Sequence, residues 1–239
     1  MNKFIFYIAY LPIRIYAFRA SPENALIFLF NLQKRIITLI SDRASDYEDG
    51  VHPKHRLMQY HLFFTTRLKS GERIIDIGSG RGFLSHKMAE TGARVVGIEL
   101  SQRNINISNK LYKNPNLTFI HGDALKYLPN QNFDTAVMSN VLEHIDDRIG
   151  FLKKVQNTLK PTRWLIRVPC FDRDWQVPLV KELGLDSRLD ETHFIEFTRE
   201  SFKEEMDKAG LKIIYLEVRW GEIWSELVPN GSTRSPQTI

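Results

Sequence analysis

Three closely spaced glycines lie between two acidic residues, and this is the pattern in the sequence most suggestive of chemistry. The run is Asp76-Ile77-Gly78-Ser79-Gly80-Arg81-Gly82, and Glu99 follows later in the chain. Glycines permit a tight turn and let a ligand approach the main chain. A carboxylate such as Glu99 can accept hydrogen bonds from ribose hydroxyls. Asp76 suits an ammonium group better than a pyrophosphate. The pattern therefore predicts a nucleoside-binding site.

The residues around the glycines predict a strand, a tight turn and a helix. The β-branched Ile74, Ile75 and Ile77 indicate a buried strand, and residues 83–89 have helical spacing. This order is typical of the ligand-binding corner of a doubly wound α/β sheet. A dinucleotide fingerprint would place its third glycine where this chain has Phe83. An NAD-dependent oxidoreductase or epimerase stays open as the alternative.

Later segments repeat the alternation of strands and helices. Residues 94–99, 117–120, 133–139 and 164–168 predict further strands, and Ser101 predicts the start of a helix that reaches Leu111. The third strand leads into Gly122-Asp123-Ala124, and the fourth into Asn140-Val141-Leu142-Glu143-His144. Residues 149–159 and 198–209 predict helices, and two strands follow at 212–219 and 221–228. These elements predict an α/β fold.

Together these motifs resemble the class I S-adenosylmethionine (SAM)-dependent methyltransferases of the methyltransferase type 11 or V-L-E-H group. The matching runs are D-I-G-S-G-R-G, G-D-A, N-V-L-E-H and L-K-P, within about residues 55–228. The resemblance implies a doubly wound, seven-stranded, mostly parallel sheet (a Rossmann-like methyltransferase fold) whose last strand inserts antiparallel. It also implies SAM as the cofactor, a methyltransferase activity and these cofactor-binding residues: Asp76, Gly78, Ser79, Gly80, Gly82, Glu99, Leu100, Asp123, Ala124 and Asn140.

Individual roles follow from the same resemblance. The glycines would line the methionine part of SAM, Asp76 its amino group, Glu99 the ribose and Asp123 the adenine. For Asp123 the alternative is an Asx turn that follows a strand. A non-catalytic binding module with the same fold is the alternative to an enzyme.

Two histidines are the candidate catalytic residues. His144 follows the fourth strand and His193 lies in an insert at 169–197, where this family builds its acceptor pocket. A hydroxyl acceptor needs a base near its proton, and a buried structural histidine is the alternative for His144. Some relatives bind a divalent metal through E-x-x-E-H and a later histidine. Asn140 replaces the first glutamate here, so we expect no metal.

Composition limits the function classes. The single Cys170 excludes an intrachain disulfide and a Cys-rich zinc site, which fits the cytoplasm. Net charge is +5, and residues 51–130 carry 12 Lys/Arg against 5 Asp/Glu. That basic segment favours an anionic substrate or is an ordinary solvated surface. No arginine-rich run argues for a nucleic-acid partner.

The N-terminal residues predict a helical extension before the fold. Residues 1–50 are rich in apolar and aromatic residues, but the uninterrupted run 4–11 is too short to span a bilayer. Three interpretations stay open: a lid, a homodimer interface, or peripheral contact with a membrane through residues 1–40. The polar residues 41–50 predict a loop, and the sequence 57–68 predicts one helix.

We therefore divide the chain into the extension at 1–50, a methyltransferase domain at 51–228 and a disordered tail at 229–239. The expected acceptor is a hydroxyl on a small molecule or glycan. A cell-surface polysaccharide or lipid-linked sugar is suggested by the aromatic N-terminus and by the Asp, Arg and Trp residues of the insert.

Overall fold

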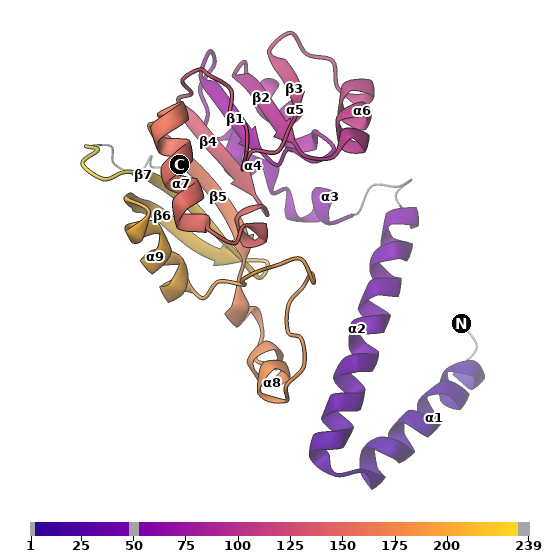
Figure 1. Ribbon diagram of the computed structural model, residues 1–239. Coiled ribbons are helices and arrows are strands. Elements are labelled where there is room, and N and C mark those ends of the chain that lie inside the picture. Colours follow the sequence, from indigo (N-terminus) through magenta and orange to yellow (C-terminus); the bar gives the residue numbers. More distant parts are fainter. Residues whose placement is uncertain (1–2, 48–52, 234–239) are drawn as a thin grey trace. The chain divides into compact units, whose positions relative to one another are not determined.

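The computed structural model describes residues 3–47 and 53–233 (Figure 1). The chain divides into two compact units, each described by itself. The sheet unit comprises Tyr60–Arg173 and Arg188–Ile239, and the helical unit comprises Met1–Gln59 and Asp174–Ser187. Residues 234–239 of the tail that the sequence analysis expects to be disordered lie outside the described residues.

One seven-stranded sheet organises the sheet unit. The strand order is β3-β2-β1-β4-β5-β7-β6, and only β7 runs antiparallel to both of its neighbours. This confirms the doubly wound, mostly parallel sheet with a C-terminal hairpin. The strands are β1 (Arg73–Ile77), β2 (Arg94–Glu99), β3 (Leu117–His121), β4 (Thr135–Ser139), β5 (Arg163–Pro169), β6 (Leu211–Arg219) and β7 (Glu222–Pro229).

Helices cover this sheet because most residues of its central strands are apolar. Every residue of β5 is buried, as expected for a strand covered on both faces. Helix α5 packs on β2 and α4, and α7 packs against α9. The helices are α4 (His61–Thr65), α5 (Phe83–Ala89), α6 (Gln102–Leu111), α7 (Arg148–Leu159) and α9 (Arg199–Lys208), with short 3-10 turns η1 (Leu142–His144) and η2 (Phe171–Arg173). Ser101 caps α6 through its side chain, as predicted.

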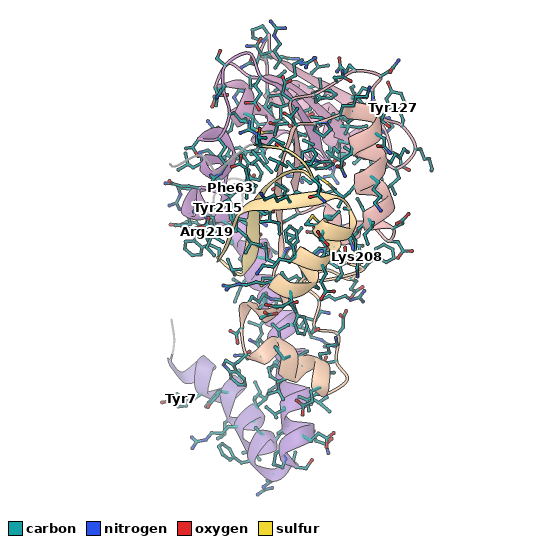
Figure 2. The ribbon with its side chains drawn as sticks, turned by 90° about the vertical axis from the view of Figure 1, so that its left-hand side faces the viewer. Tyr7, Phe63, Tyr127, Lys208, Tyr215 and Arg219 are labelled. Atoms are coloured by element: carbon teal, nitrogen blue, oxygen red, sulfur yellow. The ribbon has the colours of Figure 1, made fainter. Side chains whose placement is uncertain are left out.

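A buried ionic network closes the amino-terminal edge of the sheet. The Arg163 side chain is only 1% exposed and donates to the Thr135 hydroxyl at 2.8 Å and to Glu72. Arg67 supplies a backbone carbonyl to Arg163. The Arg67 guanidinium in turn lies 4.1 Å from the Phe63 ring centroid and 4.7 Å from that of Tyr215, both labelled in Figure 2. This network secures the edge opposite the glycine turn.

The helical unit is built from segments far apart in the sequence. Its helices are α1 (Lys3–Arg19), α2 (Pro22–Tyr47), α3 (Lys54–Met58) and α8 (Gln176–Glu182). The Tyr16 and Phe28 rings join α1 to α2 with centroids 4.7 Å apart. The Gln33 side chain donates to Gln176 at 3.1 Å, which joins α8 to α2. None of the helices in the described part of the chain is both long and apolar enough to cross a membrane.

Two local predictions about the N-terminal half are wrong. Helix α2 continues to Tyr47 through the segment predicted as a loop, helped by an Arg43–Asp46 ion pair one turn apart. The single helix predicted at 57–68 is two short helices, α3 and α4. Gln59 breaks it, because its φ of 45° is left-handed.

Candidate cofactor and acceptor site

The three glycines of the turn between β1 and α5 have different structural roles. All have positive φ: 73° at Gly78, 56° at Gly80 and 85° at Gly82. A Cβ atom at Gly78 would lie 2.5 Å from Val141, and one at Gly82 would lie 2.6 Å from Phe119. A Cβ at Gly80 would meet nothing within 4 Å. Packing therefore requires Gly78 and Gly82, whereas Gly80 borders open space that a ligand can fill.

A fourth glycine, which the sequence analysis missed, lets the turn pack on the sheet. A Cβ atom at Gly97 in β2 would lie 2.8 Å from the side chain of Ser79. The backbone N–H groups of Gly78 and Ser79 both donate to the Ile98 carbonyl, at 2.8 and 3.1 Å. Glycine inside a strand signals close approach by another segment, so this signal was present in the sequence.

Asp76 lies buried at the carboxyl end of β1, directly under the turn. Its Oδ2 accepts a hydrogen bond from the Ser85 hydroxyl at 2.5 Å. Burial raises the Asp76 pKa to about 7; the Ser85 hydrogen bond lowers it, and the nearby Glu99 charge raises it. A buried carboxyl group of this kind is stabilised as the anion when a cationic group arrives. Asp76 can therefore hold an ammonium group.

Glu99 lies at the end of β2 and already accepts three hydrogen bonds. The donors are the N–H of Gly80 at 3.0 Å, the N–H of Ser101 at 2.9 Å and the Asn104 amide at 3.2 Å. A carboxylate has about four acceptor positions. One acceptor position of Glu99 therefore remains for a ribose hydroxyl. The hydrogen bond from Gly80 also connects Glu99 to the glycine turn, at the glycine that borders open space. Leu100, the next residue, is largely exposed.

The predicted adenine contact adopts the turn that the sequence analysis held as its alternative. Asp123 Oδ1 accepts the backbone N–H of Leu125 at 3.0 Å, and Oδ2 lies 3.3 Å from the Lys126 ammonium. This is an Asx turn after β3. Ala124 packs against the apolar core. The turn does not use up the acceptor capacity of the carboxylate, so the adenine role of Asp123 stays a prediction.

The segment after β4 lies against the glycine turn. The close approach of Val141 to Gly78 fixes this placement. Asn140 has a left-handed φ of 56°, its N–H donates to the Arg167 carbonyl at 2.8 Å, and its side-chain amide donates to Glu222 at 3.1 Å. Its Oδ1 has no hydrogen-bond partner among the described residues. This oxygen can still accept a hydrogen bond from a ligand, so the cofactor-binding role of Asn140 stays a prediction.

Glu143 was not among the predicted site residues, yet it is the most unusual group at this edge. The side chain is fully buried, and neither carboxylate oxygen has a hydrogen-bond partner in the described part of the chain. Burial raises its pKa to about 8, and the nearby Arg167 charge lowers it. Its sequence signal was the N-V-L-E-H run, which does not reveal burial without partners.

The structure brings the two predicted histidines together. The centroids of the His144 and His193 rings are 4.6 Å apart, and the ring planes are nearly perpendicular. The backbone N–H of Phe194 donates to the Glu143 carbonyl at 2.8 Å, which fastens the insert after β5 to η1. Potential ligand atoms of Glu143, His144 and His193 all lie within 4.8 Å of one another. We call these three residues the acceptor-edge cluster.

Hydrogen bonds define which ring nitrogen of each histidine carries the proton. The Thr192 hydroxyl donates to Asp190 at 2.7 Å, so it must accept from Nδ1 of His144, 2.8 Å away. Nδ1 of His193 lies 3.2 Å from the Glu196 carboxylate, which can only accept. In its neutral form each ring therefore carries its proton on Nδ1 and has its lone pair on Nε2. Burial, and then the neighbouring His193, lower the pKa of His144.

Comparison with known proteins agrees with this geometry. A family model described as a methyltransferase domain matches residues 50–216. The ubiquinone biosynthesis O-methyltransferase of Albidiferax ferrireducens is 28% identical over 53% of this chain and 53% of its own length. The mitochondrial ubiquinone biosynthesis O-methyltransferase of Schizosaccharomyces pombe is 30% identical over 51% of this chain and 48% of its own. The chain thus spans about half the length of these curated relatives.

A solved structure shares the fold at low sequence identity. Magnesium protoporphyrin IX methyltransferase from Synechocystis PCC 6803, with S-adenosylhomocysteine (SAH) bound, has a TM-score of 0.57 and 16% identity, over 74% of this chain and 83% of its own. The family match and the fold together place the chain among the class I SAM-dependent methyltransferases. The chain belongs to the methyltransferase-domain family, and its cofactor is SAM. The NAD-dependent alternative is thereby set aside.

Proposed function

We propose that this methyltransferase transfers the methyl group of SAM to a hydroxyl of a small-molecule acceptor at the acceptor-edge cluster. One observation carries the proposal. Val141 lies so close to Gly78 that a Cβ atom there would clash with it, so the segment that holds Glu143 and His144 adjoins the glycine turn. The relatives named for ubiquinone biosynthesis O-methylation favour a hydroxyl acceptor.

The residues would divide the work as follows. When bound, SAM supplies an electrophilic methyl group on a sulfonium. Asp76 and Glu99 would hold its ammonium and ribose groups, Asp123 its adenine, and Gly80 would leave room for it. The exposed His144 would accept the acceptor's proton at Nε2, the buried His193 would orient the acceptor, and Asn140 would contact the cofactor. Most of the rate would come from positioning the hydroxyl oxygen in line with the methyl group.

The test separates cofactor binding from methyl transfer. We would measure SAH affinity by calorimetry and turnover with radiolabelled SAM on phenolic and sugar acceptors, the sugars testing the glycan prediction. His144→Asn and His193→Asn should keep SAH affinity within about twofold and lower turnover by about 10²–10⁴, the usual contribution of acid–base catalysis. His86→Asn on α5 is the matched control. Full turnover in both variants would contradict the proposed role of the cluster.

A divalent cation is a second candidate at the same cluster. The observation in its favour is that neither oxygen of the buried Glu143 has a hydrogen-bond partner among the described residues, and that this carboxylate lies beside two imidazoles whose neutral forms hold a lone pair on Nε2. A metal-binding histidine typically donates its other ring N–H to a carboxylate or to a group that a carboxylate orients. Nδ1 of His193 lies directly beside a carboxylate, and Nδ1 of His144 is linked to one through Thr192. These three residues fit an ion such as Mn²⁺ or Zn²⁺, although the sequence analysis expected none. The ion would lower the pKa of an acceptor hydroxyl.

Direct binding tests the cation independently of activity. Calorimetric titration of chelator-treated protein with Mn²⁺ should show one site, which Glu143→Gln and His193→Asn remove. Glu90→Gln on the surface should leave binding intact. If calorimetry finds no site for Mn²⁺ or Zn²⁺ and turnover survives treatment with a chelator, the cation is excluded. The histidine base would then be the mechanism.

A further inference from the structure

Helix α1 exposes one continuous apolar face. At about 100° per residue, five positions fall within an arc of about 100°. Each of these side chains is at least 46% exposed, and Tyr7 is labelled in Figure 2. The five are Tyr7, Ile8, Leu11, Ile15 and Phe18. A helix in water normally turns such a face toward a core, so this face calls for a different environment.

The partner helix packs on the other side of α1. Tyr16, whose ring packs at a tilt against that of Phe28 in α2, lies outside that arc. Among the side chains of α1 that the structure describes, Ile13 and Ala17 are partly buried, and both project away from that arc, as does Ala20 just after the helix. Within the helical unit the apolar face is therefore turned away from α2.

Positive charge borders this face on both sides. By the same helical geometry, Arg14 lies just before Tyr7 and Arg19 just after Ile8 around the helix. The Arg14 guanidinium is 5.9 Å from the Phe18 ring centroid, so the cation lies over the edge of the apolar face. Helix α1 has no acidic residue, and residues 1–43 carry six Lys/Arg against two Asp/Glu. An anionic partner is favoured.

The second half of α2 adds a smaller apolar surface with a similar border. Ile36, Leu39 and Ile40 are 45–64% exposed and line an open, apolar hollow. Arg43 and Tyr47 line the same hollow. Aliphatic residues flanked by arginine and tyrosine are typical of segments at a membrane–water interface.

We infer that the helical unit docks on an anionic lipid bilayer, with α1 lying in the interface plane. The apolar face would enter the headgroup–acyl boundary, and Arg14 and Arg19 would extend to lipid phosphates. A second copy of the chain fits less well, because two such surfaces would bring like charges together. The inference is independent of the acceptor, since it rests on no residue of the site.

Vesicle binding by the full chain tests this inference. Flotation with phosphatidylcholine vesicles, with and without phosphatidylglycerol, should show binding that requires the anionic lipid and weakens with salt. Arg14→Gln and Arg19→Gln should each weaken binding about fivefold. Leu11→Glu should weaken it more than tenfold. The control Leu111→Glu changes an equally exposed leucine of the sheet unit and should bind as the unchanged protein does.

Two further measurements keep the inference falsifiable. Circular dichroism and SAH affinity would verify that each variant is folded. Equal binding to both vesicle types, or binding that Leu11→Glu leaves unchanged, would overturn the inference. So would a stable dimer in solution that Leu11→Glu dissociates, because the face would then be an interface between copies.

Discussion

The Ser85 hydroxyl lies 2.5 Å from Oδ2 of Asp76, and both side chains are buried beneath the glycine turn. The Ser85 hydrogen bond lowers the Asp76 pKa, but burial outweighs it and the pKa reaches about 7. Ser85 therefore adjusts the pH at which the site carries its negative charge, and this effect can be measured.

SAH affinity should rise with pH through about 7 and level off above it, because the ligand's ammonium group pairs with ionised Asp76. Below that pH the affinity should fall about tenfold per unit as Asp76 takes up a proton. Ser85→Ala removes a hydrogen bond that lowers the pKa, so the midpoint should move to higher pH. Asp76→Asn should bind weakly at every pH. Calorimetry across this range tests all three, and a midpoint unchanged in Ser85→Ala would refute the coupling.

Asp76 also predicts how the free energy of unfolding depends on pH when no ligand is bound. The folded-state pKa of Asp76, about 7, lies above the ordinary aspartate value of 3.8, so the folded state holds this proton more tightly than the unfolded state does. This contribution is fully present below about pH 4 and is lost as pH rises through about 7. Urea unfolding should show this loss, on the order of 4 kcal/mol, reduced in Asp76→Asn. If the free energy of unfolding depends on pH equally in the unchanged protein and in Asp76→Asn, the raised pKa of the buried Asp76 is contradicted.

Gly80→Val should abolish SAH binding while the protein stays folded. The added side chain would enter the open space beside the turn and adopt an unfavourable φ of 56°. The control is Gly71→Val, since Gly71 also has positive φ and open surroundings but precedes β1. Both should lose about 1–2 kcal/mol of stability. Calorimetry should show a loss of SAH affinity only in Gly80→Val. Normal SAH binding by this variant would mean that the pocket lies elsewhere.

Glu99→Gln should weaken SAH binding by about 1.5–3 kcal/mol, the range for a hydrogen bond to a charged group. Glutamine keeps the shape of the side chain but lacks the charge that faces the ribose. The same substitution at the exposed Glu90, which pairs with Lys87, provides the control. Unchanged affinity in Glu99→Gln would remove this residue from the site.

Arg163→Met should destabilise the sheet unit by about 3–5 kcal/mol, because it leaves the largely buried Glu72 without its cation and Glu226 with Arg67 alone. Arg73→Met, which breaks the exposed pair with Asp134, should have little effect. Urea unfolding measures both changes. Since Arg163 lies at the opposite edge from the glycine turn, SAH affinity of folded Arg163→Met should be unchanged; weakened binding would show that the edges are coupled.

The central strands of the sheet could be predicted from sequence because they are mainly apolar runs bounded by turn residues. Strand β2, for example, has the predicted bounds, and the capped helices α6 and α9 start where Ser101 and Thr198 indicate. Local signals suffice for such elements. Gln59 shows the limit, since nothing in its sequence context indicates a left-handed residue between two helices.

The site was only partly predictable, for a physical reason. The acidic and glycine residues of the cofactor turn follow strands directly, so the topology gathers them. The meeting of His193 with His144 depends on the path of the insert after β5, including the Phe194 hydrogen bond to Glu143. Residues distant in sequence carry no local sign of that contact, and the burial of Glu143 depends on it as well.

The membership of α8 in the helical unit has a consequence for dissecting the protein. The chain passes from one unit to the other three times, near residues 59, 173 and 187. A truncation that starts at Tyr60 would delete Gln33 and Lys34, the partners of Gln176 and Asp186. It would leave an orphaned helix inside the remaining polypeptide. Deleting the N-terminus is therefore no clean separation of modules, and point substitutions are the sounder way to separate their roles.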